Sequence, residues 1–168
     1  MLIAIYLASI VLANLLVTWF GPSASIIDAF LLIALDLTAR DKLHDQWEHK
    51  NLWRNMTLLI LTGSVLSAVL NVNALPIATA SFVAFMASGS IDTVVYAALG
   101  KRAKLLQVNG SNIASAAVDS LIFPALAFGL PLLWPVVIGQ FAAKVLGGSL
   151  WAWVLYRPVW RRVGLVKG

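Results

Sequence analysis

Long apolar stretches fill most of this chain, and each is long enough to cross a membrane as a helix. The sequence has 168 residues, of which 61% are hydrophobic and only 11% charged, whereas a soluble domain usually carries about 25% charged residues. A helix needs about 20 residues to cross the hydrocarbon. We therefore predict an all-α membrane protein, a single domain over 1–168, with six transmembrane helices at about 2–20, 25–40, 56–72, 76–98, 106–129 and 132–156.

The connections between these stretches alternate between uncharged and basic ones. Those at 21–22, 71–76 and 129–131 carry no charge, and eleven of the twelve Lys and Arg residues lie within 39–55, within 99–105 or after the last stretch. Loops rich in Lys and Arg face the cytoplasm. Both termini are therefore predicted to be cytoplasmic, in a bacterial inner membrane. The net charge of +5 is then explained by topology rather than by nucleic-acid binding.

Residues 41–54 are predicted to form a short amphipathic cytoplasmic segment, with Leu43 and Trp47 facing the membrane. His44, Asp45, Glu48 and His49 also lie there, but no HExxH pattern accompanies them, and the chain has no cysteine. We expect a solvated polar face rather than a metal site.

Charged residues inside the apolar stretches are the strongest functional signal. Asp28, Asp36, Asp92, Asp119 and Lys144 all lie where hydrocarbon is expected. A charge at the centre of a bilayer costs about 2.5 to 3.5 kcal/mol on insertion scales. It is tolerated mainly where it faces a cavity, a substrate or a partner charge. The sequence therefore predicts a polar interior, which favours transport.

The central polar pair is predicted to be Asp119 with Lys144. These residues lie at nearly equal distances from the turn between the last two stretches, so they share a depth. Asn112 and Ser115 are on the same helical face as Asp119, and Gln140 is on that of Lys144. Two interpretations stay open, an ion pair that only holds two helices together or part of a substrate site. A buried ion pair is a poor stabiliser, which favours the site.

Two other acids also lie on polar faces. Asp92 follows Ser88 and precedes Tyr96 by four residues each, so the three line one stripe that suits a cavity wall. Asp36 lies four residues before Arg40. The sequence leaves open whether the two form a local salt bridge or belong to the substrate site.

Asp28 and Asn14 are weaker signals. The spacing of Ser25 and Asp28 resembles a capping box, so capping is the expected role of this acid. Asn14 is a lone amide in the first stretch, and the sequence leaves open whether it bonds to another helix or to a substrate.

No catalytic or nucleotide-binding motif is present in the sequence. It contains no GxGxxG, P-loop or GxSxG pattern. We therefore predict neither an enzyme nor a bound cofactor. If transport is coupled to protons, Asp119 is the favoured carrier, because burial disfavours an ionised acid.

Three segments resemble the VUT family, also called queuosine precursor transporters. They are DLTARDKLHDQW at 36–47, SNIAS at 111–115 followed by Asp119, and GQFAAK at 139–144. Together with the six stretches, the resemblance covers nearly the whole chain. It implies import of 7-deazaguanine precursors of queuosine, chiefly 7-cyano-7-deazaguanine. It also implies a fold similar to the substrate-binding components of energy-coupling-factor importers.

The chemistry of a 7-deazaguanine suits these residues. A carboxylate of Asp119 or Asp92 can accept two of its N–H donors side by side. Its carbonyl can accept from a polar side chain, and Tyr96 or a tryptophan can stack on the ring. The residues predicted to bind the substrate are Asp119, Lys144, Gln140, Asn112, Ser115, Asp92, Tyr96, Asn14, Asp36 and Arg40.

Other functions remain open at this point. The chain could be a substrate-binding subunit that needs a separate energising complex, docked on the small residues Ala4 and Ala8. It could also be a membrane-embedded enzyme or an assembly factor whose charges only pair helices. The expected partners are a small 7-deazapurine, the lipid bilayer, and either a second copy or an energising subunit; nucleic acid is not expected.

Overall fold

The computed structural model describes residues 2–47, 51–99 and 104–155, and all their regular structure is helical. The all-helical fold predicted from the sequence is thus confirmed. The elements are α1 (Leu2–Phe20), α2 (Ala24–Asp28), η1 (Ala29–Ile33), α3 (Ala34–Trp47), α4 (Leu52–Leu70), η2 (Val72–Ala74), α5 (Leu75–Leu99), α6 (Lys104–Phe128) and α7 (Trp134–Leu155).

The second helical segment is continuous from α2 through η1 to α3, and η1 is a π-helical turn. π-Helical turns inside α-helices occur frequently at functional sites. The segment continues to Trp47, beyond the predicted end at residue 40. Leu43 is 1% exposed and packs in a core cluster with Tyr6 and Met56. The prediction that Leu43 faces the membrane is therefore wrong. Residues 48–50 of the predicted amphipathic segment lie outside the described residues.

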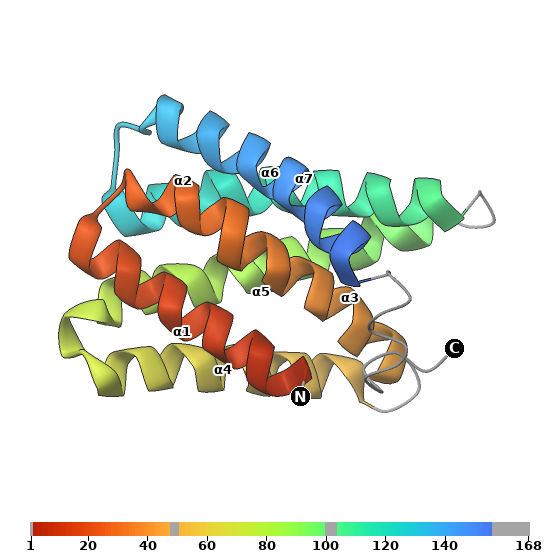
Figure 1. Ribbon diagram of the computed structural model, residues 1–168, viewed down its shortest axis with the longest axis horizontal. Helices are drawn as coiled ribbons and strands as arrows, with labels where there is room; N and C mark the ends of the chain where they lie inside the picture. The colour runs from red at the N-terminus through yellow and green to blue at the C-terminus, as the bar shows by residue number, and fades with distance from the viewer. Residues whose placement is uncertain (1, 48–50, 100–103, 156–168) are drawn as a thin grey trace.

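The helical segments run along one axis of the bundle and alternate in direction (Figure 1). The turns after α1, α4 and α6 lie at one end, which we call the tight-turn end. Gly21 and Gly129 close two of these turns with φ of +73° and +81°, which glycine adopts without strain. The helix ends beside the basic connections lie at the other end, the basic end, together with the start of α1 and the end of α7.

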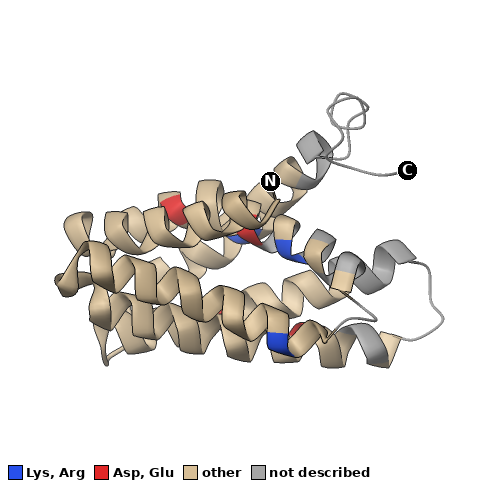
Figure 2. Ribbon diagram, turned by 90° about the horizontal axis from the view of Figure 1, so that it is seen from below, with Lys and Arg blue, Asp and Glu red and all other residues tan. Residues whose placement is uncertain are grey.

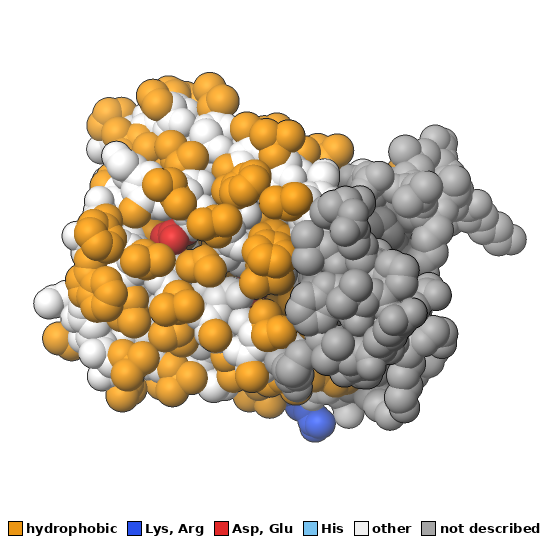
Figure 3. Space-filling view, in the orientation of Figure 1, with side chains coloured by type: hydrophobic (Ala, Val, Ile, Leu, Met, Phe, Trp, Pro, Cys, Tyr) orange, Lys and Arg blue, Asp and Glu red, His pale blue; other side chains and the backbone are white. Residues whose placement is uncertain are grey.

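The lipid-facing surface of the bundle is apolar. Large side chains such as Phe20, Val69 and Leu130 are 69%, 76% and 80% exposed, and hydrophobic atoms dominate the face in Figure 3. Charged positions are few along the helices, and none is coloured at the tight-turn end in Figure 2. The segments long and apolar enough to cross a membrane, among the described residues, are Leu2–Phe20, Leu52–Leu70, Val72–Val95 and Gly110–Phe128.

Two further long segments, α2 to α3 and α7, carry the buried charges that lower their hydropathy. Asp28, Asp36 and Arg40 belong to the former, and Lys144 to the latter. The chain is thus a multi-pass membrane protein. A count of six spans stays a prediction.

Small residues let α7 approach the second segment closely. A Cβ atom added at Gly147 would collide with the carbonyl oxygen of Phe30 and the side chain of Ala34, and one added at Gly139 would lie 2.8 Å from Ile26. Helix association in lipid depends on such close packing. These contacts turn the face of α7 that carries Gly139 and Gly147 toward the second segment and the interior of the bundle.

We expect Gly147→Ala to destabilise the protein by about 1 to 3 kcal/mol, because the new methyl group overpacks against rigid backbone. Thermal unfolding of the purified protein in detergent measures the loss. Gly148→Ala is the matched control, because a Cβ atom there meets nothing within 4 Å. Equal melting temperatures for the two variants would contradict this account of the contact.

Candidate functional site

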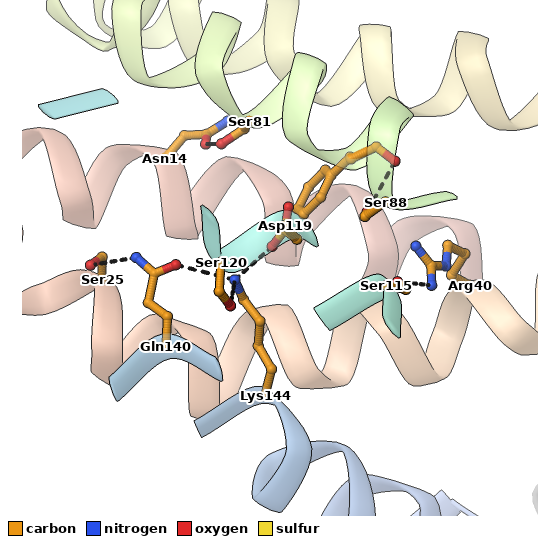
Figure 4. A network of polar contacts seen from close by, with 11 residues as sticks. Asn14, Ser25, Arg40, Ser81, Ser88, Ser115, Asp119, Ser120, Gln140 and Lys144 are labelled. Atoms are coloured by element: carbon orange, nitrogen blue, oxygen red, sulfur yellow. Dashed lines mark hydrogen bonds and ion pairs between the residues drawn. The ribbon is translucent and has the colours of Figure 1, made fainter. Parts of the chain in front are cut away.

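Polar side chains from several helices meet in the middle of the bundle (Figure 4). They come from α1 to α7, and burial is nearly complete. On α6, the spacing of Ser115 and Asp119 turns both inward, at 0% and 2% exposure. Their arrangement falls into three layers between the basic end and the tight-turn end.

Lys144 lies at the centre of the middle layer. Its Nζ is 2.6 Å from Oδ2 of Asp119 and donates to Oγ of Ser120 at 3.0 Å and to Oε1 of Gln140 at 3.1 Å. The predicted pair of Asp119 and Lys144 is therefore present. An ammonium group has three donors, so Lys144 has none left for a ligand in this conformation. Its role is to hold Asp119 and Gln140.

Gln140 extends this network toward the tight-turn end. Its Nε2 donates to Oγ of Ser25 at 2.8 Å, and Ser25 in turn donates to the carbonyl of Pro22 at 2.5 Å. Ser25 therefore links α2 to α7. The predicted capping box is wrong, because the N-cap of α2 is Ser23 and it makes no side-chain cap bond. Asp28 is buried, and its Oδ2 has no hydrogen-bond partner in the described part of the chain.

Asn14 joins three helices, α1, α4 and α5, in another layer of contacts. Its Nδ2 donates to Oγ of Ser67 on α4 at 3.1 Å, and its Oδ1 accepts from Oγ of Ser81 on α5 at 2.6 Å. Ser67 also donates to the carbonyl of Gly63 at 2.8 Å. Of the two open roles for Asn14, the bond to other helices is present.

The third layer lies nearer the basic end, around Arg40. Its Nη2 donates to Oγ of Ser115 at 3.1 Å and lies 3.9 Å from Oδ1 of Asp92. These contacts join α3 to α5 and α6. Asp36 and Tyr6 are buried beside this layer, within electrostatic reach of Arg40 and Asp119.

For the remaining predicted residues, the structure gives a position along a helix. Asn112 lies one turn before Ser115 on α6 and is half-buried. Ser88 is fully buried on α5, one turn before Asp92. The side chain of Tyr96 lies outside the described part of the structure. Participation of all these residues in binding stays a prediction.

A cavity lies between the middle layer and the tight-turn end. Its polar lining consists of Asn14, Ser25, Asp28, Ser81, Asp119, Gln140 and Lys144. Phe85 and Phe123 add aromatic walls to it. The cavity has a volume of about 20 Å³, which is room for about one water molecule. The cavity as it stands is too small for a ring-shaped ligand, and in this sense we call it occluded.

The unused hydrogen-bonding groups of this cavity define what it can bind. Oδ1 of Asp119 is a buried acceptor without a hydrogen-bond partner in the described residues. The amide nitrogens of Gln140 and Asn14 each make one of their two possible hydrogen bonds. A ligand with at least two donors, one acceptor and a flat apolar body matches this set.

The sequence patterns did not predict a role for Phe85, Phe123 or Ser81, and they assigned Ser25 and Asp28 to a helix cap. Phe85 lies four residues after Ser81, and Phe123 four after Asp119, so each continues an inward polar face. That spacing was a usable signal. Ser81 lies on the same face of α5 as Ser88 and Asp92, so the same signal applied to it. Only the packing of helices distant in sequence shows that Ser25 and Asp28 line a cavity.

The chain matches one family of known proteins. The family described as "Putative vitamin uptake transporter" matches residues 2–157. No curated protein and no solved structure matches the chain.

We expect Lys144→Met to destabilise the protein by about 3 to 5 kcal/mol, because it leaves the buried carboxylate of Asp119 unpaired. The double variant Asp119→Leu, Lys144→Met should recover most of the loss, since no buried charge is stranded. Thermal unfolding in detergent measures both. Arg54→Met is the control, because Arg54 is exposed. If Lys144→Met were as stable as Arg54→Met, the predicted cost of leaving Asp119 unpaired would be refuted.

Proposed function

The chain belongs to the vitamin uptake transporter family and is a multi-pass membrane transporter, and from this premise we propose that it imports a 7-deazapurine precursor of queuosine. The preferred cargo is 7-cyano-7-deazaguanine. One observation carries the proposal, an occluded cavity in which Asp119 presents a buried acceptor beside unused amide donors and aromatic walls.

The groups of a 7-deazaguanine complement those of the cavity. The ring N–H and the amino group of the cargo face Oδ1 of Asp119, as carboxylates accept from base edges. The carbonyl of the cargo accepts the unused N–H of Gln140. Lys144 orients Asp119 rather than touching the cargo. Phe85 or Phe123 stacks on the bicyclic ring, a contact worth about 1 to 3 kcal/mol per base.

The layers on either side of the cavity suit alternating access. The layer of Arg40, Ser115 and Asp92 closes the side toward the basic end. Toward the tight-turn end, the bond of Gln140 to Ser25 and those of Asn14 to Ser67 and Ser81 hold the helices together. By the positive-inside rule, the basic end faces the cytoplasm of a bacterial inner membrane. Cargo then enters from the tight-turn end and leaves past Arg40.

A second candidate is the substrate-binding subunit of an importer that has a separate energising complex. Ala4 and Ala8 are exposed on one face of α1, as a docking surface of small residues requires. Uptake that is lost in cells without such a complex, or co-purification of a partner on this face, favours this candidate.

We expect the wild-type protein to restore queuosine in bacteria that cannot make 7-cyano-7-deazaguanine and lack their own importer. The measurement is queuosine in tRNA at a limiting supply of the precursor. Asp119→Asn should lower uptake by about tenfold or more, because a hydrogen bond to a charged group contributes about 1.5 to 3 kcal/mol. Arg54→Gln, at an exposed position, is the control.

Three outcomes of this experiment have different meanings. Restoration that depends on Asp119 supports both the cargo and the site. Restoration that survives Asp119→Asn keeps the cargo but removes the central site. No restoration by wild-type protein present in the membrane would refute the cargo.

Phe123→Ala should weaken binding of 7-cyano-7-deazaguanine by about fivefold to a hundredfold, because it removes a stacking surface. Binding to the purified protein by titration calorimetry measures the change. Phe20→Ala is the matched control, since Phe20 is 69% exposed on the lipid-facing surface. Equal affinities for the two variants would exclude stacking on Phe123.

A further inference from the structure

Asp28 is a buried acid that the contacts proposed for the cargo leave unused. The residue is 4% exposed, and its Oδ2 has no hydrogen-bond partner among the described residues. It lines the same cavity as Asp119. Resting on the proposed function, we propose that Asp28 is a proton-binding site and that its proton moves through the membrane together with the cargo.

The groups around Asp28 offer it no counter-charge. On α7, Lys144 is the cation that lines the cavity, and its donors are taken by Asp119, Ser120 and Gln140. No cation lies within ion-pair distance of Asp28 in the described part of the chain.

The other elements packed around the cavity also place no cation beside Asp28 in the described residues. On α1, the titratable group is Tyr6, which lies near Asp36 and Asp119 rather than at the cavity. The cavity-lining residues of η1 and α5 are not titratable, and α6 contributes Asp119. Asp36, further along the second segment, does not line the cavity either.

Two cations are buried among the described residues, Arg40 and Lys144, and each lies close to a buried acid other than Asp28. Asp119 is paired with Lys144 at 2.6 Å, and Asp92 with Arg40 at 3.9 Å. Asp36 lies within electrostatic reach of Arg40. Asp28 is left as the cavity acid with no cation. The structure therefore moves the proton-carrying role from Asp119, which sequence analysis favoured, to Asp28.

Burial without a partner charge favours the protonated form of a carboxyl group. The ionised form in an apolar interior is costly enough that such groups take up a proton instead. In the occluded form, Asp28 therefore carries a proton on one carboxyl oxygen. When the cavity opens to water, hydration favours ionisation, and the O–H bond breaks by transfer of the proton to a water molecule.

This exchange couples the proton to the direction of transport. Asp28 lies toward the tight-turn end of the second segment. It takes a proton from water on that side when the cavity is open there. The cavity can then close with the acid neutral, and the proton leaves on the basic side after the cargo. One proton crosses with each cargo molecule, and no other reactant is needed.

The test uses the full chain, purified and reconstituted into liposomes, with radiolabelled 7-cyano-7-deazaguanine. One assay measures exchange of labelled for unlabelled cargo without a gradient. The other measures accumulation driven by a proton gradient that is acidic on the side of the tight-turn end. At one proton per cargo, one pH unit supports about tenfold accumulation. A sodium gradient of the same size is the control for another cation.

Three proteins are compared in both assays. Wild type and Asp28→Glu should exchange cargo and also accumulate it in response to the proton gradient. Asp28→Asn mimics the protonated acid permanently, so it should exchange cargo but lose the gradient-driven accumulation. Gel filtration in detergent verifies that each variant is folded.

The outcomes separate this inference from the cargo assignment. If wild type does not exchange cargo, the proposed function fails. If wild type exchanges cargo but ignores the proton gradient, or if Asp28→Asn still accumulates it, the proton site at Asp28 is refuted. A response to sodium rather than to protons also refutes it. If Asp28→Asn does not fold, the gradient response of wild type and its retention in Asp28→Glu decide.

Discussion

The three donors of the Lys144 ammonium group fix the centre of this bundle. A buried ammonium is tolerated only when a partner charge and hydrogen-bond acceptors surround it, and Asp119, Ser120 and Gln140 provide them. Gln140 is thereby oriented so that its amide reaches Ser25 on α2. One cation thus joins three helices. Because it engages a single oxygen of Asp119, the other oxygen stays open toward the cavity.

The packing of the helices around Lys144 follows from the lipid environment of the bundle. Lipid is as apolar as the helix surfaces, so burial of apolar area gives little drive for association. Packing of small residues and hydrogen bonds between helices take its place. Gly63 lets Ile10 of α1 approach α4, and Asn14 bonds to both α4 and α5. The helices therefore meet through polar and small residues, while the bulky side chains point outward.

The sequence predicted those features that depend on position along a helix. The all-helical fold, the tight turns and the pairing of Asp119 with Lys144 follow from periodicity and from counting depth. The predictions were wrong where one local sequence pattern is compatible with two different environments. The spacing of Ser25 and Asp28 resembles a cap but belongs to the cavity. An apolar residue such as Leu43 can face lipid or core with equal hydropathy, and only tertiary packing distinguishes the two.

The contact between Gly147 and the backbone of Phe30 has a mechanical consequence. Side chains that interdigitate can slide past each other by changing rotamers, but a backbone carbonyl set against a glycine has no such freedom. α7 and the π-helical turn are therefore expected to travel as one rigid body. The contacts that can give way are the hydrogen bond of Arg40 to Ser115 and its longer ion pair with Asp92, because water can replace either partner as the cavity opens. The interface between α7 and the π-helical turn is thus rigid, whereas the polar interface with α5 and α6 can take up water.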